Sequence, residues 1–175
     1  MSPIDALHAW HPFYSLLGAA SATMVGLLFV AASVGSGAFT PGRRAPLRVF
    51  LSASVVNFGL TLALSLIVLA PLPNGRWLGA LILICSLFGL THASLAWRDT
   101  LKDGRLIHLL DLDDRVCYLA LPSLGYLGVA ASGMLFVFES AAGCTVLAVA
   151  VAVLLAIAIR NAWDITLWII TRQRD

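Results

Sequence analysis

Charged residues are scarce in this sequence of 175 residues, making up 11% of it, whereas an ordinary soluble domain carries about 25%. Too few charges are present to cover a folded globule with polar surface, which excludes a water-soluble domain. The charges nearly balance, with 11 basic and 9 acidic residues. A nucleic-acid-binding surface shows as a basic stripe, so we expect no nucleic-acid partner.

Cysteine is also scarce, and its three positions are Cys85, Cys117 and Cys144. An odd number at wide spacing excludes a disulfide framework and a zinc-type pair, and favours small buried apolar side chains. Enzyme signatures are absent as well, since the sequence has no His-Glu-x-x-His, no Gly-x-Ser-x-Gly, no phosphate-binding glycine loop and no dinucleotide fingerprint. We therefore expect no enzymatic activity, no cofactor and no metal.

Apolar residues, in contrast, make up 60% of the chain and give a mean hydropathy of +0.93. A helix that spans a membrane needs about 20 consecutive, mostly apolar residues. Five stretches meet this length, and breakers or charged segments separate them: 13–35, 47–70, 76–97, 116–138 and 141–163. The sequence therefore predicts an all-α fold, a polytopic transmembrane bundle of five helices that forms one domain over residues 1–175.

Basic residues lie almost entirely on one side of this predicted bundle. Arg76 is alone on one side, and nine residues fall on the other: Arg43, Arg44, Arg48, Arg98, Lys102, Arg105, Arg115, Arg172 and Arg174. Because cytoplasmic loops retain Lys and Arg, we predict the N-terminus outside and the C-terminus inside. Arginine dominates over lysine, and Ala, Leu and Val are abundant, as is typical of GC-rich bacteria. We therefore expect a multi-pass protein of the bacterial inner (plasma) membrane.

A short helix is predicted before the first span, because Ser2, Pro3 and Asp5 form a typical helix start. Its apolar residues share one face, so we expect this helix to lie on the outside surface of the membrane that the bundle spans. His8 and His11 follow at a spacing of three, but two ligands without a third do not predict a metal site.

The fifth apolar stretch continues beyond the predicted span, as a cytoplasmic helix extension over 164–171. The resulting helix of about 31 residues would be about 46 Å long, at about 1.5 Å per residue. A hydrocarbon core of about 30 Å cannot contain it. The extension, with its isoleucines and a tryptophan, is therefore expected to contact a partner surface.

Small residues at four-residue spacing predict where the helices approach closely, because membrane helices associate through backbone proximity. At this spacing the first predicted span carries Gly18, Ala22 and Gly26, and the fifth carries Ala148, Ala152 and Ala156. The fourth span carries Gly125 and Gly128, three residues apart. Three such faces exceed what five helices in a linear chain require. We therefore expect a homo-oligomer.

Polar residues on the second span follow one helical face, and they are Ser54, Asn57, Thr61 and Ser65. A buried amide must find a partner, so this seam either joins helices by hydrogen bonds or forms the wet wall of a conduction path. Both interpretations remain open from the sequence.

Charged and titratable groups near the predicted inner boundary are few. Arg160 and Asp164 extend the alanine face of the fifth span at the same spacing. They form either a local interfacial pair or a ring of charges at the cytoplasmic mouth of an oligomeric pore. His92 of the third span is interpreted either as hydrogen-bonded structure or as a pH-responsive group.

Two functions follow as hypotheses. The first is a homo-oligomer in the lipid bilayer that forms a small-ion channel or pore, with the seam on the path and Arg160 and Asp164 at its mouth. The alternative is a non-conducting accessory or scaffold subunit. It would dock a larger membrane complex, through a membrane-protein partner bound to the C-terminal helix and the inner loop 98–115.

Overall fold

The computed structural model describes residues 3–35, 44–102 and 116–172, and this part of the chain consists of helices joined by short turns, without strands. A short helix α1 precedes five long helical segments, the fourth of which begins with a π-helical turn, η3. The bounds are α1 (Pro3–His8), α2 (His11–Gly35), α3 (Arg44–Leu69), α4 (Gly75–Lys102), η3 (Val116–Ala120), α7 (Leu121–Val137) and α8 (Ala142–Arg172).

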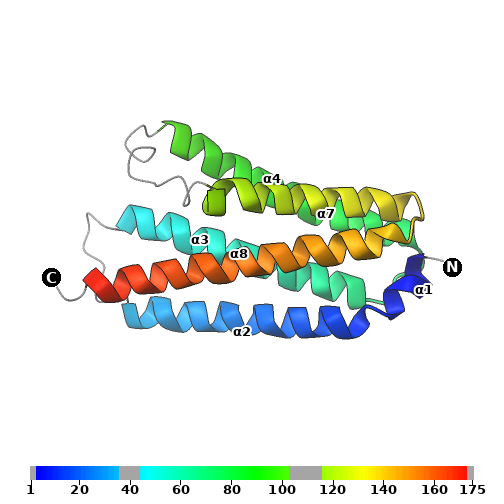
Figure 1. Ribbon diagram of the computed structural model, residues 1–175, viewed down its shortest axis with the longest axis horizontal. Helices are drawn as coiled ribbons and strands as arrows, with labels where there is room; N and C mark the ends of the chain where they lie inside the picture. The colour runs from blue at the N-terminus through cyan, green and yellow to red at the C-terminus, as the bar shows by residue number, and fades with distance from the viewer. Residues whose placement is uncertain (1–2, 36–43, 103–115, 173–175) are drawn as a thin grey trace.

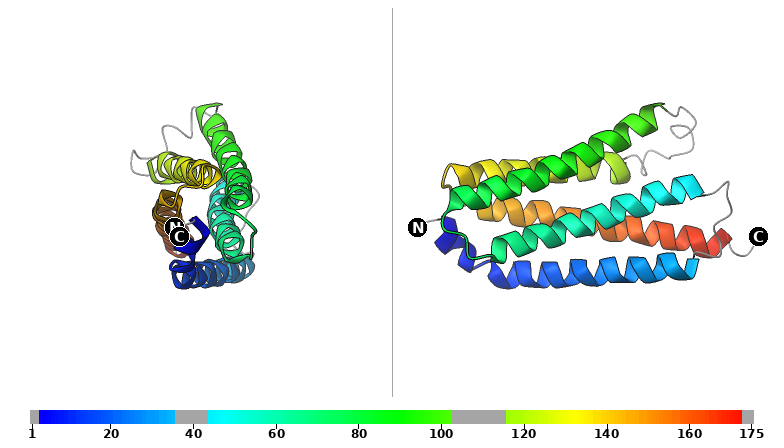
Figure 2. Two further views of the ribbon diagram at one scale, coloured as in Figure 1. Left: turned by 90° about the vertical axis from the view of Figure 1, so that its right-hand side faces the viewer. Right: turned by 180° about the vertical axis from the view of Figure 1, so that it is seen from behind.

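The long helices form an antiparallel bundle (Figure 1). Viewed end-on, α3 and α8 lie in the middle, with α4 and α7 on one side and α2 on the other (Figure 2). Helix α1 lies at one end of the bundle, and the last turns of α8 lie at the opposite end. This arrangement places α3 in contact with α2, α4 and α8.

Within the described residues, four helices are long and apolar enough to cross a membrane, and their spans are His11–Ser33, Gly75–Arg98, Cys117–Val137 and Ala142–Asp164. The fifth predicted span, 47–70, coincides with most of α3, and the part of it that the structure describes with side chains, Ser54–Leu69, is an apolar helix. Several of the basic residues belong to 36–43 and 103–115, which lie outside the described residues together with Ser2. The side of the membrane that each end faces therefore stays a prediction.

Local sequence explains where the helices begin and end. The side-chain oxygen of Asn74 accepts a hydrogen bond from the Trp77 amide at 3.1 Å and so caps the start of α4. Pro122 lies at the start of α7 and cannot donate to the carbonyl one turn earlier, so the chain enters this helix through the π-helical turn η3. Helix α8 continues without interruption for 31 residues.

The turn from α7 to α8 closes with a Schellman motif. The Ser140 amide donates to the Leu135 carbonyl at 2.9 Å, and the Glu139 amide donates to the Phe136 carbonyl at 3.0 Å. Glu139 occupies the left-handed position of this motif, with φ 55°, where glycine is the usual residue. Across the turn, Glu139 Oε1 lies 3.8 Å from Arg76 Nε at the start of α4.

The main core lies between α2, α3, α4, α7 and α8, and its largest buried side chains include Tyr14, Tyr126, Phe136, Leu64 and Leu78. A smaller apolar cluster toward the other end joins α2, α3 and α8 through Leu28, Phe58, Ala158 and Ala162. Helix α1 is held at the bundle end by Leu7, which is 4% exposed and belongs to the main core. The outer faces of the helices remain largely apolar and exposed, as a surrounding bilayer requires.

Candidate functional site

The polar seam of α3 lies inside the bundle. Its four side chains are at most 3% exposed, and they are Ser54, Asn57, Thr61 and Ser65. An exposure this low means that the seam contacts almost no space large enough for a water molecule. The seam is therefore a dry, packed feature of the single chain.

Two of the seam hydroxyls are satisfied by their own helix. The Thr61 hydroxyl donates to the Asn57 carbonyl at 2.9 Å, and the Ser65 hydroxyl donates to the Thr61 carbonyl at 2.8 Å. Bonds of this kind, to the carbonyl one turn earlier, let serine and threonine lie in an apolar helix without a partner on another helix.

The Asn57 amide finds its partner on a different helix. The hydroxyl of Tyr126 on α7 donates a hydrogen bond to Asn57 Oδ1, and both side chains are buried. The Tyr126 ring lies against Gly89 of α4, where a Cβ atom would collide with it. Tyr126 thus joins α3, α4 and α7 in the interior of the bundle, a role that the sequence analysis did not assign to it.

Asn161 forms a second polar junction, nearer the C-terminal end of α8. Its side-chain Nδ2 donates to the Cys117 carbonyl at 3.4 Å, and its own carbonyl accepts from the Tyr118 hydroxyl at 3.3 Å. Asn161 is fully buried and ties α8 to the π-helical turn η3. The sequence analysis passed over Asn161 between Arg160 and Asp164, although an amide within an apolar helix is itself a signal.

Four buried side-chain oxygens have no hydrogen-bond partner within the described chain: Ser21 Oγ, Ser54 Oγ, Asn161 Oδ1 and Asp164 Oδ2. They come from α2, α3 and α8, which pack together. Hydroxyl and amide groups of this kind can orient helices, but none of them titrates near neutral pH or is a strong metal ligand. Among the described residues, no cluster of three His, Cys, Asp or Glu side chains occurs.

Arg160 and Asp164 form the local pair that their spacing predicts, with Nη1 and Oδ2 3.7 Å apart. The two side chains are 43% and 36% exposed, so the pair lies at the surface of the bundle rather than in a packed interface of the single chain. An exposed pair of this kind stabilises a helix by about 0.3–0.5 kcal/mol. His92 is half-buried on α4, and Cys85 on the same helix is also half-buried.

The predicted packing residues divide into two groups. Those that serve contacts within the chain lie close to a neighbouring helix: Gly18 against Ser65, Gly125 against Leu154, Gly128 against Ala150, and the buried Ala148. Ala152 is half-buried, whereas Ala22, Gly26 and Ala156 are exposed. Nothing lies within 4 Å of a Cβ placed on Gly26.

The closest helix approach uses glycines that the sequence analysis did not select. A Cβ on Gly79 of α4 would lie 2.6 Å from the Gly133 carbonyl oxygen of α7. One turn before Gly79, a Cβ on Gly75 would lie 3.2 Å from the Phe136 carbonyl oxygen. The Gly75-x-x-x-Gly79 spacing is the usual sequence signal for such a contact. This spacing was available in the sequence and marks a face of α4 for close packing, and the structure shows that the partner is α7.

No protein-family model, curated protein or solved structure matches this chain. The functional conclusion accordingly rests on the burial, hydrogen bonds and exposed faces of the chain itself.

Proposed function

We propose that this multi-pass membrane protein is a homo-oligomeric scaffold or accessory subunit that does not conduct ions through its own bundle. Four helices long and apolar enough to span a bilayer support the membrane assignment. The observation that carries the functional proposal is the burial of the polar seam, in which the Thr61 and Ser65 hydroxyls and Asn57 Oδ1 bond to protein groups and Ser54 is 0% exposed. Ions require a path whose lining side chains contact water, and the seam side chains do not.

The proposal includes α3 as a fifth span. Helix α3 covers 26 residues, runs beside α2 and α8 in the bundle and contacts both (Figure 1). A helix embedded between spanning neighbours occupies the same bilayer thickness, because an end left in hydrocarbon would expose unpaired backbone groups. With five spans, the distribution of Lys and Arg between the two ends of the bundle supports an N-terminus outside and a C-terminus inside a bacterial inner membrane.

Homo-oligomerisation is supported by the outward face of α2. Small residues follow this exposed face through Ser15, Ala19, Ala22, Gly26 and Ser33. Large apolar residues flank it, among them Leu16, Leu27 and Val30. A face of this composition lets a second helix backbone approach closely and gains little from contact with lipid alone.

The exposed faces of α4 and α7 have a different composition. They carry large apolar side chains: Ile84, Leu87, Phe88 and Leu95 on α4, and Leu124, Leu127, Met134 and Phe138 on α7. Such faces are typical of contact with acyl chains. The contrast favours α2 as the helix that meets a second copy.

The side chains of the extension after Asp164 and of 102–115 in the inner loop, both proposed as docking segments for a further membrane protein, lie outside the described residues.

A small-ion pore between copies is the second candidate. It is favoured by the hydroxyl groups of Ser15, Thr23 and Ser33, which lie on exposed parts of α2. In an oligomer built around α2, these hydroxyls would line the axis, and the exposed Arg160 and Asp164 would lie toward the end of the bundle where α2 ends.

Conductance separates the two candidates. The purified full chain is reconstituted in planar bilayers and recorded under voltage, membrane tension and pH steps. A scaffold gives no unitary current in preparations where crosslinking shows the oligomer. Unitary currents that disappear in Ala22→Leu protein, but persist in protein carrying Leu87→Ala on the exposed face of α4, would contradict the scaffold and support the pore between copies.

A further inference from the structure

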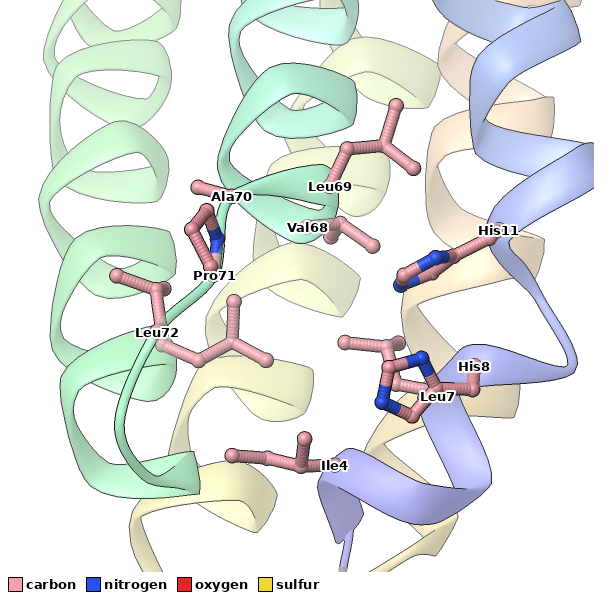
Figure 3. Close-up of a pocket in the computed structure, with 10 residues that line it drawn as sticks. Ile4, Leu7, His8, His11, Val68, Leu69, Ala70, Pro71 and Leu72 are labelled. Atoms are coloured by element: carbon pink, nitrogen blue, oxygen red, sulfur yellow. The ribbon is translucent and has the colours of Figure 1, made fainter.

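A pocket lies at the end of the bundle that carries α1 (Figure 3). It has a volume of about 330 Å³ and is bounded by α1, the start of α2, the end of α3 with its following turn, and α4. Its walls are almost entirely aliphatic, formed by Ile4 and Leu7 of α1, Val68, Leu69 and Leu72 around the end of α3, and Leu78 of α4. Ala70 and Pro71 complete the lining and are exposed, so the pocket opens to the surface.

Two imidazoles are the polar side chains of this lining. His8 ends α1 and His11 begins α2, and their rings project into the pocket with centroids 4.8 Å apart (Figure 3). His8 is exposed and His11 half-buried, so both lie at the open side of the aliphatic wall. No third metal-binding side chain joins them within the described chain, which argues against a metal centre.

The pocket lies at the depth where the apolar segments of α2, α3 and α4 begin or end. One candidate span begins at His11, the apolar segment of α3 ends at Leu69, and the span in α4 begins at Gly75. The aliphatic wall therefore faces the edge of the hydrocarbon layer, while the imidazoles lie where lipid head groups and water meet it. An amphiphilic molecule that enters from the membrane would place its apolar tail against the aliphatic wall and its polar head group beside His8 and His11.

We propose that this pocket binds a single-chain lipid with a carboxylate head, a free fatty acid, its acyl chain against the aliphatic wall and its carboxylate between His8 and His11. Each imidazole supplies an N–H donor whether neutral or protonated, and a carboxylate accepts from both. The volume is near the lower end of the range of about 300–1,000 Å³ for ligand pockets, which suits one acyl chain better than the two of a phospholipid. This proposal is independent of the scaffold function.

Photolabelling tests the site in the full-length protein in phosphatidylcholine nanodiscs. A diazirine-bearing fatty acid is the probe, and dodecanoate, dodecanol and lysophosphatidic acid are the competitors. We expect saturable labelling of the peptides that contain Leu7 and Val68–Leu72, with dodecanoate competing at least 10-fold better than dodecanol. Labelling spread evenly over exposed residues such as Leu87 and Phe88, or equal competition by the alcohol, would overturn the proposal. Stronger competition by lysophosphatidic acid than by dodecanoate would overturn the carboxylate assignment.

Matched variants separate the tail site from the head site. Ala70→Phe fills the pocket from an exposed position and is expected to reduce labelling at least 10-fold. Ala142→Phe is the control, because Ala142 is exposed at the same end of the bundle but does not line the pocket. His8→Leu combined with His11→Leu is expected to keep acyl binding but to lose the preference for dodecanoate over dodecanol. Unchanged labelling of Ala70→Phe, or an unchanged preference in the double variant, would contradict the site.

Discussion

The Tyr126 hydroxyl donates a hydrogen bond to Asn57 Oδ1, and this contact joins α7 to α3 inside the bundle. Asn57 and Tyr126 are 69 residues apart in the sequence, and both are buried. Because Asn57 is 3% and Tyr126 is 1% exposed, neither group has water as an alternative partner. The loss of unfolding free energy when this hydrogen bond is removed therefore measures how much the seam stabilises the fold.

Tyr126→Phe is expected to lower the free energy of unfolding by about 0.5–2 kcal/mol, because it leaves the Asn57 amide oxygen without a donor. Unfolding of the purified protein in mixed micelles, followed by circular dichroism, measures the change. In a double-mutant cycle, Asn57→Leu combined with Tyr126→Phe should cost less than the sum of the two single variants. Additive costs would show that the two side chains do not interact.

The close approach of α4 and α7 gives a second prediction. Gly79→Ala is expected to destabilise the bundle by about 1–3 kcal/mol, because the new Cβ would meet the Gly133 carbonyl oxygen and the Val137 amide nitrogen, which are backbone atoms. Gly59→Ala is the control, since nothing lies within 4 Å of a Cβ at that position. Micelle unfolding should show no loss for Gly59→Ala and up to about 1 kcal/mol of gain from its higher helix propensity. Equal behaviour of the two variants would contradict the helix pairing.

The turn at Glu139 makes a third prediction. Glu139→Gly removes the cost of a left-handed backbone at a residue with a side chain, and it loses only an exposed pair with Arg76. Glu139→Ala loses the same pair and keeps the unfavourable backbone. We therefore expect the glycine variant to be more stable than the alanine variant by about 1 kcal/mol in the same unfolding assay. The opposite order would mean that the turn is built differently.

The outward face of α2 predicts how copies meet. In protein whose three natural cysteines are replaced, Ala22→Cys or Gly26→Cys should form disulfide-linked dimers in membranes on mild oxidation. Leu87→Cys, on the exposed face of α4, is the control and should remain monomeric. Dimers of the α4 variant alone would place the interface elsewhere, and no dimers at any position would argue for a single copy.

The sequence predicted the helices well because each apolar run is far longer than a strand and is bounded by residues that end helices. Pro71 and Pro73 follow α3, for example, and the Glu139 turn separates α7 from α8. The predicted span 76–97 begins one residue after the first residue of α4, Gly75. Within the described residues, four of the predicted spans are helices long and apolar enough to cross a membrane, and the described part of the fifth, Ser54–Leu69, is also an apolar helix.

The sequence could not assign faces to helices that are apolar all round. Gly18, Ala22 and Gly26 have the same spacing, yet Gly18 packs on Ser65 while the other two are exposed. In water an amphipathic pattern would separate these faces, but lipid and protein interior are similarly apolar, so the pattern carries little directional information. For the same reason the partner of Asn57 was not predictable, because tyrosines occur on more than one helix and only the tertiary arrangement selects Tyr126.

The reactivity of thiols placed in the polar seam shows whether the seam is dry when the protein is in a membrane, which is the basis of the proposal that the bundle does not conduct. Ser65→Cys and Ser54→Cys replace buried hydroxyls with thiols of similar size, in protein without its natural cysteines, and Asn74→Cys marks an exposed turn. The rates of reaction with a charged, membrane-impermeant thiosulfonate are measured from both sides of sealed vesicles. The account predicts rapid reaction at position 74 and no reaction at positions 54 and 65 from either side. Reaction at both seam positions at a rate close to that of position 74 would show a water-filled path and contradict the account.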